Sequence, residues 1–197
     1  MNKKCKIIIA GVGGQGVVFL TEILVDAAVR ANIPVATSEI HGLSQRGGSV
    51  MAGITFGENT FGFVEEGGAD FLLGLELLEA QRCISYLHKE SVAVIDNTQI
   101  FPHSVNSQKA IYPDTQSLIG FLKKNISDVI LIDDQSKDIP PVMKNFVVLA
   151  KAASHKDFPV KTKFIEEAIK ENARGNPEKS LEIFRKSFNN IHSKKSI

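Results

Sequence analysis

The chain has 197 residues, of which 43% are hydrophobic and 23% charged, and its formal net charge at pH 7 is +1. This length is sufficient for one domain with a hydrophobic core, and the composition is ordinary for a globular protein. The near-neutral charge and the lack of a basic or stacked-aromatic motif argue against nucleic acid as a partner, and no apolar stretch is long enough to cross a membrane.

The first predicted element is a strand over residues 6–10, an apolar run typical of a strand covered on both faces. The segment GVGGQG follows it, and an apolar pattern predicts a helix over residues 17–30. Because the basic and apolar start ends in this glycine loop and not in a cleavage site, we expect no signal peptide and a cytoplasmic protein. Gly11, Gly13 and Gly16 have the G-x-G-x-x-G spacing of dinucleotide-binding loops. Such glycines permit a tight turn, and the N-terminus of the next helix attracts an anion or a carbonyl group.

A second strand is predicted over residues 35–38, and the polar, glycine-rich segment HGLSQRGG follows it. A dinucleotide site needs an acidic residue about 20 residues beyond the glycines, and Glu39 lies roughly 25 beyond them. A third strand is predicted over residues 49–56, with Gly53 marking a bulge or a close approach. After the turn at residues 57–59, residues 61–64 are predicted to pair back as a hairpin.

Strands and helices alternate through the rest of the chain. Further strands are predicted at residues 71–74, 91–96 and 129–133, with a loop-rich segment over residues 97–112. Helices are predicted over residues 77–87, from the cap residue Asp114 to about residue 124, after Pro140, around residues 164–169, and after Asn176. This alternation predicts an α/β fold: a single, Rossmann-like domain with an open, mostly parallel sheet and helices on both faces. We expect the domain to span residues 1–190 and residues 191–197 to form a frayed tail.

Cysteine and histidine usage limits the chemistry of the chain itself. Cys5 and Cys83 are too few for a [4Fe–4S] cluster or a cysteine-rich zinc site, and we expect both to be plain small residues of the core or the surface. The histidines have no metal-ligand spacing, and no Ser-His-Asp arrangement follows from the pattern. We therefore predict no metal site and no catalytic residue in this chain. Asp96-Asn97-Thr98 ends a predicted strand, where it can line a ligand site.

The densest polar group lies in the second glycine-rich segment. Arg46 can offer a bidentate fork to a carboxylate or a diphosphate, and Gly47 and Gly48 permit close approach. Glu39 can orient Arg46 or His41. The alternative is a surface loop whose side chains are only solvated. At the tip of the first loop, the Gln15 amide either bonds to neighbouring groups or is exposed and idle. The candidate residues for a cofactor or a partner are Gly11, Gly13, Gly14, Gln15, Gly16, Glu39, His41, Gln45, Arg46, Gly47 and Gly48.

Taken together, GVGGQG and the later TSEIHGLSQRGGSV resemble the small, gamma-type subunit or domain of the 2-oxoacid:ferredoxin oxidoreductases. Within that family, EIHGLSQRGG is most similar to the small subunit of the indolepyruvate branch. The segments DFLLGLELLEAQR, VIDNTQIFP and KNFVVLAKAA are also similar, so the resemblance spans nearly the whole chain. Leu77 departs from the family, which often has proline there, and the departure affects only a helix start.

The resemblance implies a thiamine-diphosphate-dependent reaction in which an aryl 2-oxoacid is decarboxylated, coenzyme A takes the acyl group and ferredoxin takes the electrons. This chain has no Gly-Asp-Gly…Asn thiamine motif, so thiamine diphosphate, Mg²⁺ and the [4Fe–4S] clusters are expected on a large partner subunit. The chain is then an accessory subunit that is inactive alone and meets ferredoxin through the complex. Whether its loops contact coenzyme A or thiamine diphosphate stays open. Two alternatives are a free-standing NAD(P)- or FAD-binding oxidoreductase and a nucleotide-binding regulatory protein.

Overall fold

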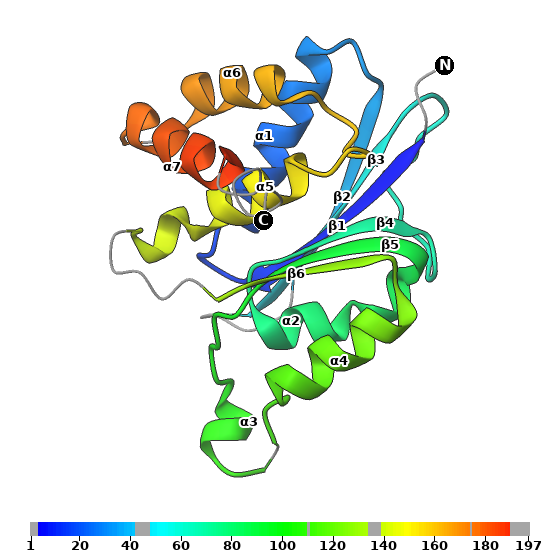
Figure 1. Cartoon of the computed structure of the whole chain (residues 1–197), viewed down its shortest axis with the longest axis vertical. Coiled ribbons are helices and arrows are strands. Elements are labelled where there is room, and N and C mark those ends of the chain that lie inside the picture. The colour runs from blue at the N-terminus through cyan, green and yellow to red at the C-terminus, as the bar shows by residue number, and fades with distance from the viewer. Residues whose placement is uncertain (1–3, 42–47, 110, 134–138, 174, 190–197) are drawn as a thin grey trace, which may run out of the picture.

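The computed structural model describes residues 4–41, 48–109, 111–133, 139–173 and 175–189. A six-stranded sheet runs through the molecule, with helices on both of its faces (Figure 1). In chain order the elements are β1 (Cys5–Val12), α1 (Val17–Arg30), β2 (Val35–His41), β3 (Ser49–Phe56), β4 (Ala69–Gly74), α2 (Leu77–Arg82), a 3-10 turn (Ile84–Tyr86), β5 (Leu87–Asp96), α3 (His103–Asn106), α4 (Thr115–Asn125), β6 (Asp128–Ile132), a 3-10 turn (Pro141–Met143), α5 (Lys144–Ala153), α6 (Thr162–Asn172) and α7 (Pro177–Asn189).

The strand order across the sheet is β2-β3-β1-β4-β5-β6. Strands β1, β4, β5 and β6 pair in parallel, whereas β3 is antiparallel to both of its neighbours, β1 and β2. Strand β3 is therefore the one that runs against the other five, and the predicted mostly parallel α/β sheet is confirmed. The connection after β1 crosses one face and the connection after β4 crosses the other, which makes the β1–β4 boundary the topological switch point.

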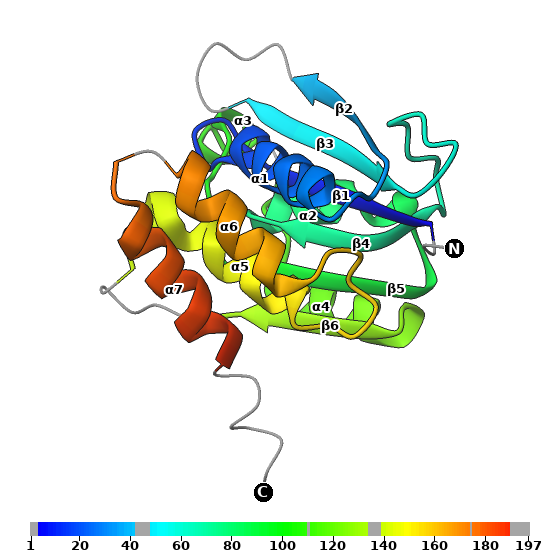
Figure 2. The same ribbon diagram turned by 90° about the horizontal axis from the view of Figure 1, so that it is seen from above.

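Alternating side chains of the buried strands supply two cores. Ile7 and Ile9 point from β1 toward α1 and α5, and Ile8 points toward α2 and α4. On the first face, α6 packs against α1 and α7 against α5, so that face carries two helical layers (Figure 2). None of the helices in the described ranges is long and apolar enough to cross a membrane.

Most predicted elements occur where the sequence places them, and two helix caps are confirmed. The Asp114 carboxylate accepts a hydrogen bond from the Ser117 N–H at 2.7 Å, and the Asn176 side chain accepts one from the Lys179 N–H at 2.9 Å. The predicted helix over residues 77–87 is shorter, because α2 ends at Arg82 and β5 already begins at Leu87. The short helix α3 lies within the segment predicted to be loop-rich.

The predicted hairpin strand over residues 61–64 is wrong. This segment lies across β2 and β3 and bonds to side chains instead of joining the ladder. The Gly62 N–H donates to Thr55 Oγ1 at 3.1 Å, and the Gly62 carbonyl accepts from Ser38 Oγ at 2.8 Å. A Cβ atom on Gly53 would lie 3.2 Å from the Gly62 carbonyl oxygen, so Gly53 marks the predicted close approach.

Candidate functional site

The turn between β1 and α1 depends on glycine at particular positions. Gly14 has φ +93° and Gly16 has φ +88°, both in the left-handed region that other residues avoid. Gly16 is also the N-cap of α1, and a Cβ atom there would lie 2.4 Å from Asn145 Nδ2. A Cβ atom on Gly11 would lie 3.0 Å from Gln15 Oε1 and 3.1 Å from Leu75 Cβ. The sharp strand-to-helix turn predicted from these glycines is confirmed.

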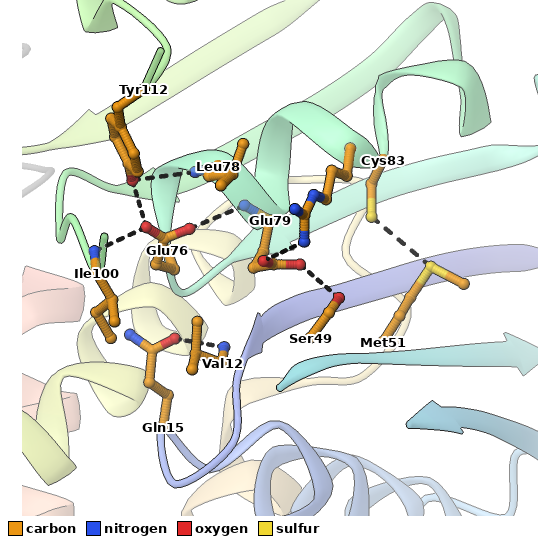
Figure 3. A network of polar contacts seen from close by, with 11 residues as sticks. Val12, Gln15, Ser49, Met51, Glu76, Leu78, Glu79, Cys83, Ile100 and Tyr112 are labelled. Atoms are coloured by element: carbon orange, nitrogen blue, oxygen red, sulfur yellow. Dashed lines mark hydrogen bonds and ion pairs between the residues drawn. The ribbon is translucent and has the colours of Figure 1, made fainter. Parts of the chain in front are cut away.

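The Gln15 side chain bridges the ends of β1 and β4, the two strands at the switch point. Its Oε1 accepts a hydrogen bond from the Val12 N–H at 2.7 Å, and its Nε2 donates to the Leu75 carbonyl at 2.8 Å (Figure 3 shows the first of these). Of the two possibilities left open by the sequence, the amide bonds to its neighbours and is not idle. Gln15 therefore ties the glycine turn to the end of β4.

This geometry differs from that of a dinucleotide-binding domain. In such domains the second strand lies beside the first, which brings its terminal acidic residue to the ribose. Here β3 lies between β1 and β2, and Glu39 is an exposed residue of the outermost strand. The Gln15 amide also bonds to the main chain at the ends of both strands that flank the switch point. The arrangement does not support a ribose-binding role for Glu39.

The described ends of the two glycine-rich segments are joined directly. The Gly13 N–H donates a hydrogen bond to the Gly48 carbonyl at 2.9 Å. His41 is the last residue of β2, whereas Gln45, Arg46 and Gly47 lie outside the described residues. The structure thus brings Gly48 to the first loop, in agreement with the paired motif recognised in the sequence.

Two buried carboxylates behind these loops were missed by the sequence analysis. Glu76 is fully buried at the start of α2, where it accepts hydrogen bonds from the Glu79 and Ile100 N–H groups, both at 2.9 Å, and from the Tyr112 hydroxyl (Figure 3). Glu79 accepts from Ser49 Oγ at 2.5 Å and pairs with Arg82 at 2.8 Å. The network therefore links β3, immediately after Gly48, to the segment that leads into α4. The sequence signal that could have revealed these carboxylates is the pair of glutamates in the otherwise apolar segment LELLEA, residues 75–80.

Burial in this region shifts two pKa values. Burial, and then the hydrogen bond to Glu76, raise the pKa of Tyr112 well above its ordinary value. Burial, and then the nearby Glu79 charge, raise the pKa of the Cys83 thiol to about 12. Both groups therefore stay protonated and neutral at physiological pH. Cys83 contacts Met51, with 3.7 Å between the sulfur atoms, and behaves as a packing residue.

A cavity of about 570 Å³ opens at the N-terminus of α1. Glycines of the turn, apolar side chains of α1 and α5, Glu22 and Asn145 line it. A smaller cavity of about 270 Å³ adjoins it and shares Gly14, Val142 and Asn145 as lining residues. Asp96 and Thr98, from the segment predicted to line a ligand site, line the smaller cavity. The larger volume is within the range of small-molecule sites.

The described residues form no cluster of three or more histidine, cysteine, aspartate or glutamate side chains able to hold a metal ion. Cys5 and Cys83 are both buried thiols outside any disulfide. Cys5 belongs to the core beneath α1, and Cys83 belongs to the core on the opposite face of the sheet. These two thiols therefore do not provide the ligands that an iron–sulfur cluster needs.

Solved structures share this fold. The gamma subunit of a keto/oxoacid ferredoxin oxidoreductase from Geobacter sulfurreducens superposes with a TM-score of 0.65 at 20% identity, covering 96% of this chain and 99% of that one. A 2-oxoglutarate:ferredoxin oxidoreductase from Magnetococcus marinus, solved with 2-oxoglutarate, coenzyme A and succinyl-CoA bound, gives a TM-score of 0.70 at 16% identity. The match covers 98% of this chain and 31% of that chain.

The chain is also similar in sequence to named proteins over most of its length. A protein of Archaeoglobus fulgidus named indolepyruvate oxidoreductase subunit IorB is 34% identical over 174 residues, which is 87% of each chain. A protein of the same name from Thermococcus kodakarensis is 32% identical, covering 94% of this chain and 93% of that one. The family model described as pyruvate ferredoxin/flavodoxin oxidoreductase matches residues 6–190. With this match, the two joined glycine-rich segments and the shared fold, the chain belongs to the pyruvate ferredoxin/flavodoxin oxidoreductase family.

Proposed function

We propose that this chain is the small subunit of a complex that oxidatively decarboxylates aryl 2-oxoacids of the indolepyruvate type. The observation that carries the proposal is the similarity, over nearly the whole chain, to relatives named indolepyruvate oxidoreductase subunit IorB. The hydrogen bond between Gly13 and Gly48 supports it, because it unites the two segments on which the family resemblance rests.

In the proposed reaction, the 2-oxoacid loses CO₂, its acyl carbon forms a thioester with coenzyme A, and two electrons pass to ferredoxin. Thiamine diphosphate supplies carbanion stabilisation in such chemistry, and iron–sulfur clusters carry the electrons. The described residues of this chain do not fit either group, since they include no metal-binding cluster and the two cysteines lie in separate cores. We therefore assign thiamine diphosphate, Mg²⁺ and the [4Fe–4S] clusters to a large partner subunit, which also meets ferredoxin.

The role proposed for this chain is to present its loops to the large subunit and to coenzyme A. The candidate residues are the glycine turn from Gly11 to Gly16 together with Glu39, His41, Gln45, Arg46, Gly47 and Gly48. Gly11 and Gln15 contribute by shaping the turn. Gly11 lies close to Gln15 and Leu75, and the Gln15 amide bonds to the main chain of Val12 and Leu75. The cavity at the N-terminus of α1 lies beside this turn and is the proposed place for part of coenzyme A.

The test is reconstitution with a candidate large subunit that carries thiamine-binding and ferredoxin-type cysteine motifs. Indolepyruvate-dependent reduction of ferredoxin should require both chains and coenzyme A. Phenylpyruvate and 4-hydroxyphenylpyruvate should also be turned over, and pyruvate and 2-oxoglutarate should be much poorer substrates. Equal turnover by the large subunit alone would refute the accessory role, and a preference for pyruvate would refute the substrate class. In a parallel titration of the isolated chain, micromolar binding of NAD(P)H or FAD would favour a free-standing oxidoreductase instead.

A further inference from the structure

Asp96, the last residue of β5, places a buried carboxylate at the carboxyl end of the parallel strands. Its side chain points to the same face of the sheet as those of Val92 and Val94, because side chains alternate along a strand and these two belong to the core beneath α5. Asp96 is 3% exposed, and it lines the cavity of about 270 Å³ at this end of the sheet. A buried carboxylate therefore borders an open space.

One oxygen of this carboxylate has no donor within the described part of the chain. The Asp96 carboxylate accepts two hydrogen bonds from described residues, one from the Thr98 N–H at 2.7 Å and one from the Thr98 hydroxyl, and both end on Oδ1. Buried carboxylates need hydrogen bonds or an opposite charge to offset the loss of water. Asp96 Oδ2 is thus the atom that a donor in the cavity can reach.

Lys144, the first residue of α5, lines the same cavity. The side chain of a helical residue leans toward the N-terminal end of its helix, which is the end where this cavity lies. Lys144 is half-buried and, among the residues that the structure describes, pairs with no carboxylate, Asp96 included. Asp96 and Lys144 carry the charges of the described cavity wall, and they do not neutralise each other.

Two unpaired opposite charges in one small cavity restrict the ligand. A simple anion is attracted by Lys144 but repelled by Asp96, and a simple amine meets the reverse. The described residues also form no cluster of three metal-ligating side chains around Asp96. A zwitterion satisfies both groups, because its ammonium donates to the carboxylate and its own carboxylate accepts from the lysine.

The walls and the volume limit the rest of the ligand. The apolar part of the lining comes from Leu75, Ile100, Val142 and Val148. The volume lies just below the roughly 300–1,000 Å³ of ordinary small-molecule sites, so the ligand is small. The cavity also lies where open α/β sheets bind ligands, at the carboxyl ends of the strands beside the switch point.

We propose that this cavity binds a free α-amino acid with an apolar side chain. The ammonium group of the ligand donates to Asp96 Oδ2, its carboxylate accepts from Lys144 Nζ, and its side chain packs against the apolar wall. The site goes beyond the proposed function and does not depend on it, because all of the named groups belong to this chain. Gly14 also lines the cavity, so the bound amino acid lies beside the glycine turn.

The first test is a calorimetric titration of the full chain with L-leucine and two analogues that each lack one charge. The analogue 4-methylpentanoate lacks the ammonium group, and 3-methylbutylamine lacks the carboxylate. We expect L-leucine to bind with a Kd below about 1 mM and each analogue to bind at least about tenfold more weakly, since each leaves one charge of the cavity unpaired.

The second test uses one variant for each charge. Asp96→Asn keeps Oδ1 for Thr98 but places an amide donor where the ligand ammonium binds, and Lys144→Met removes the ammonium group at similar length. Each variant should weaken L-leucine binding at least about tenfold. The matched controls are Asp128→Asn and Lys123→Met, which change exposed residues outside the cavity and should leave the Kd unchanged.

The analogues separate recognition from damage to the fold. Lys144→Met should weaken 4-methylpentanoate binding but not 3-methylbutylamine binding, and Asp96→Asn should do the opposite. A structural defect would weaken both analogues alike. The Tm of each ligand-free variant shows whether it folds, and if Asp96→Asn does not fold, the opposite responses of the two analogues to Lys144→Met still decide the matter.

Three results would overturn the proposal. The first is the absence of saturable L-leucine binding by the wild-type chain up to about 10 mM. The second is equal binding of L-leucine and either analogue, which would mean that one of the two charges has no part in recognition. The third is an unchanged Kd in a folded Asp96→Asn or Lys144→Met variant. Failure of ferredoxin reduction in the reconstituted complex would refute the proposed function and leave this site untouched.

Discussion

The Gln15 side-chain amide donates a hydrogen bond to the main-chain carbonyl of Leu75, 60 residues further along the chain, at 2.8 Å. The same amide accepts a hydrogen bond from the Val12 N–H at 2.7 Å. One side chain therefore satisfies main-chain groups at the ends of β1 and β4, the two strands that flank the switch point. In nucleotide-binding folds ligands bind in the crevice at this point, and here a residue of the glycine loop itself bonds to the ends of both strands and lines the smaller cavity.

Gln15→Ala should therefore reduce stability rather than remove a ligand contact. The variant leaves the Val12 N–H and the Leu75 carbonyl without these partners, at a cost of about 1–3 kcal/mol in the free energy of unfolding. Urea unfolding measures the change. The control is Gln99→Ala, whose exposed amide makes one 3.3 Å contact with Thr115 and should change stability by less than about 0.5 kcal/mol. Equal losses in the two variants would contradict the role assigned to Gln15.

The stabilities of three Gly→Ala variants should depend on the backbone conformation at each glycine and on the space available for a Cβ atom. Gly14→Ala meets no atom within 4 Å but must adopt φ +93°, which costs about 1–2 kcal/mol. Gly16→Ala has the same kind of strain and also approaches Asn145, which adds about 1–3 kcal/mol. Gly120→Ala lies within α4 in open space and should stabilise the chain by about 0.5–1 kcal/mol. Thermal unfolding of the three variants checks the order, and a Gly16→Ala variant as stable as Gly120→Ala would contradict it.

The sequence predicted the local elements well where apolar periodicity and glycine coincide. Helix α1 and strand β3 have the predicted bounds, because a buried run flanked by glycine or a turn leaves few alternatives. The hairpin prediction for residues 61–64 failed because the aromatic residues in this segment give it the composition of a strand. The left-handed Gly62, with φ +71°, instead lays this segment across the sheet.

The site was predictable only in part, since its key polar contacts join distant residues. The glycine turn follows from local conformational rules, and the sequence placed it correctly. By contrast, Glu76 meets Tyr112 from 36 positions away, and Asn145 reaches Gly16 from a helix on another part of the chain. The insertion of β3 between β1 and β2 also depends on strand pairing that no local pattern specifies, and it separates Glu39 from the turn.

The buried thiol of Cys83 predicts a loss of stability at alkaline pH. Burial, and then the Glu79 charge, raise its pKa to about 12 from an ordinary value of 9.0, so the unfolded chain releases this proton first as the pH rises. Its contribution is fully present below pH 9 and should decline by about 1.4 kcal/mol per pH unit between pH 9 and 12.

Urea unfolding between pH 8 and 11 measures this decline. Cys83→Ala should have a shallower slope in that range, even though it lowers stability at pH 7. The raised pKa of Tyr112 adds a second decline that begins above pH 10 and persists in Cys83→Ala. Identical slopes in wild type and Cys83→Ala would show that the thiol does not titrate as its burial implies.

The bond between Ser49 and Glu79 should stabilise the chain more than an ordinary serine contact does. Ser49 Oγ donates to a buried carboxylate at 2.5 Å, and hydrogen bonds to charged groups contribute about 1.5–3 kcal/mol. Ser38, on the neighbouring strand β2, provides the matched control, because its hydroxyl donates to the neutral Gly62 carbonyl at 2.8 Å. Ser49→Ala should lower the free energy of unfolding more than Ser38→Ala does, by about 1 kcal/mol.

A double-mutant cycle of Ser49→Ala with Glu79→Gln should give a coupling energy of about 1–2 kcal/mol. Additive effects would mean that the carboxylate does not hold β3 at its Gly48 end, because residues in direct contact must be coupled.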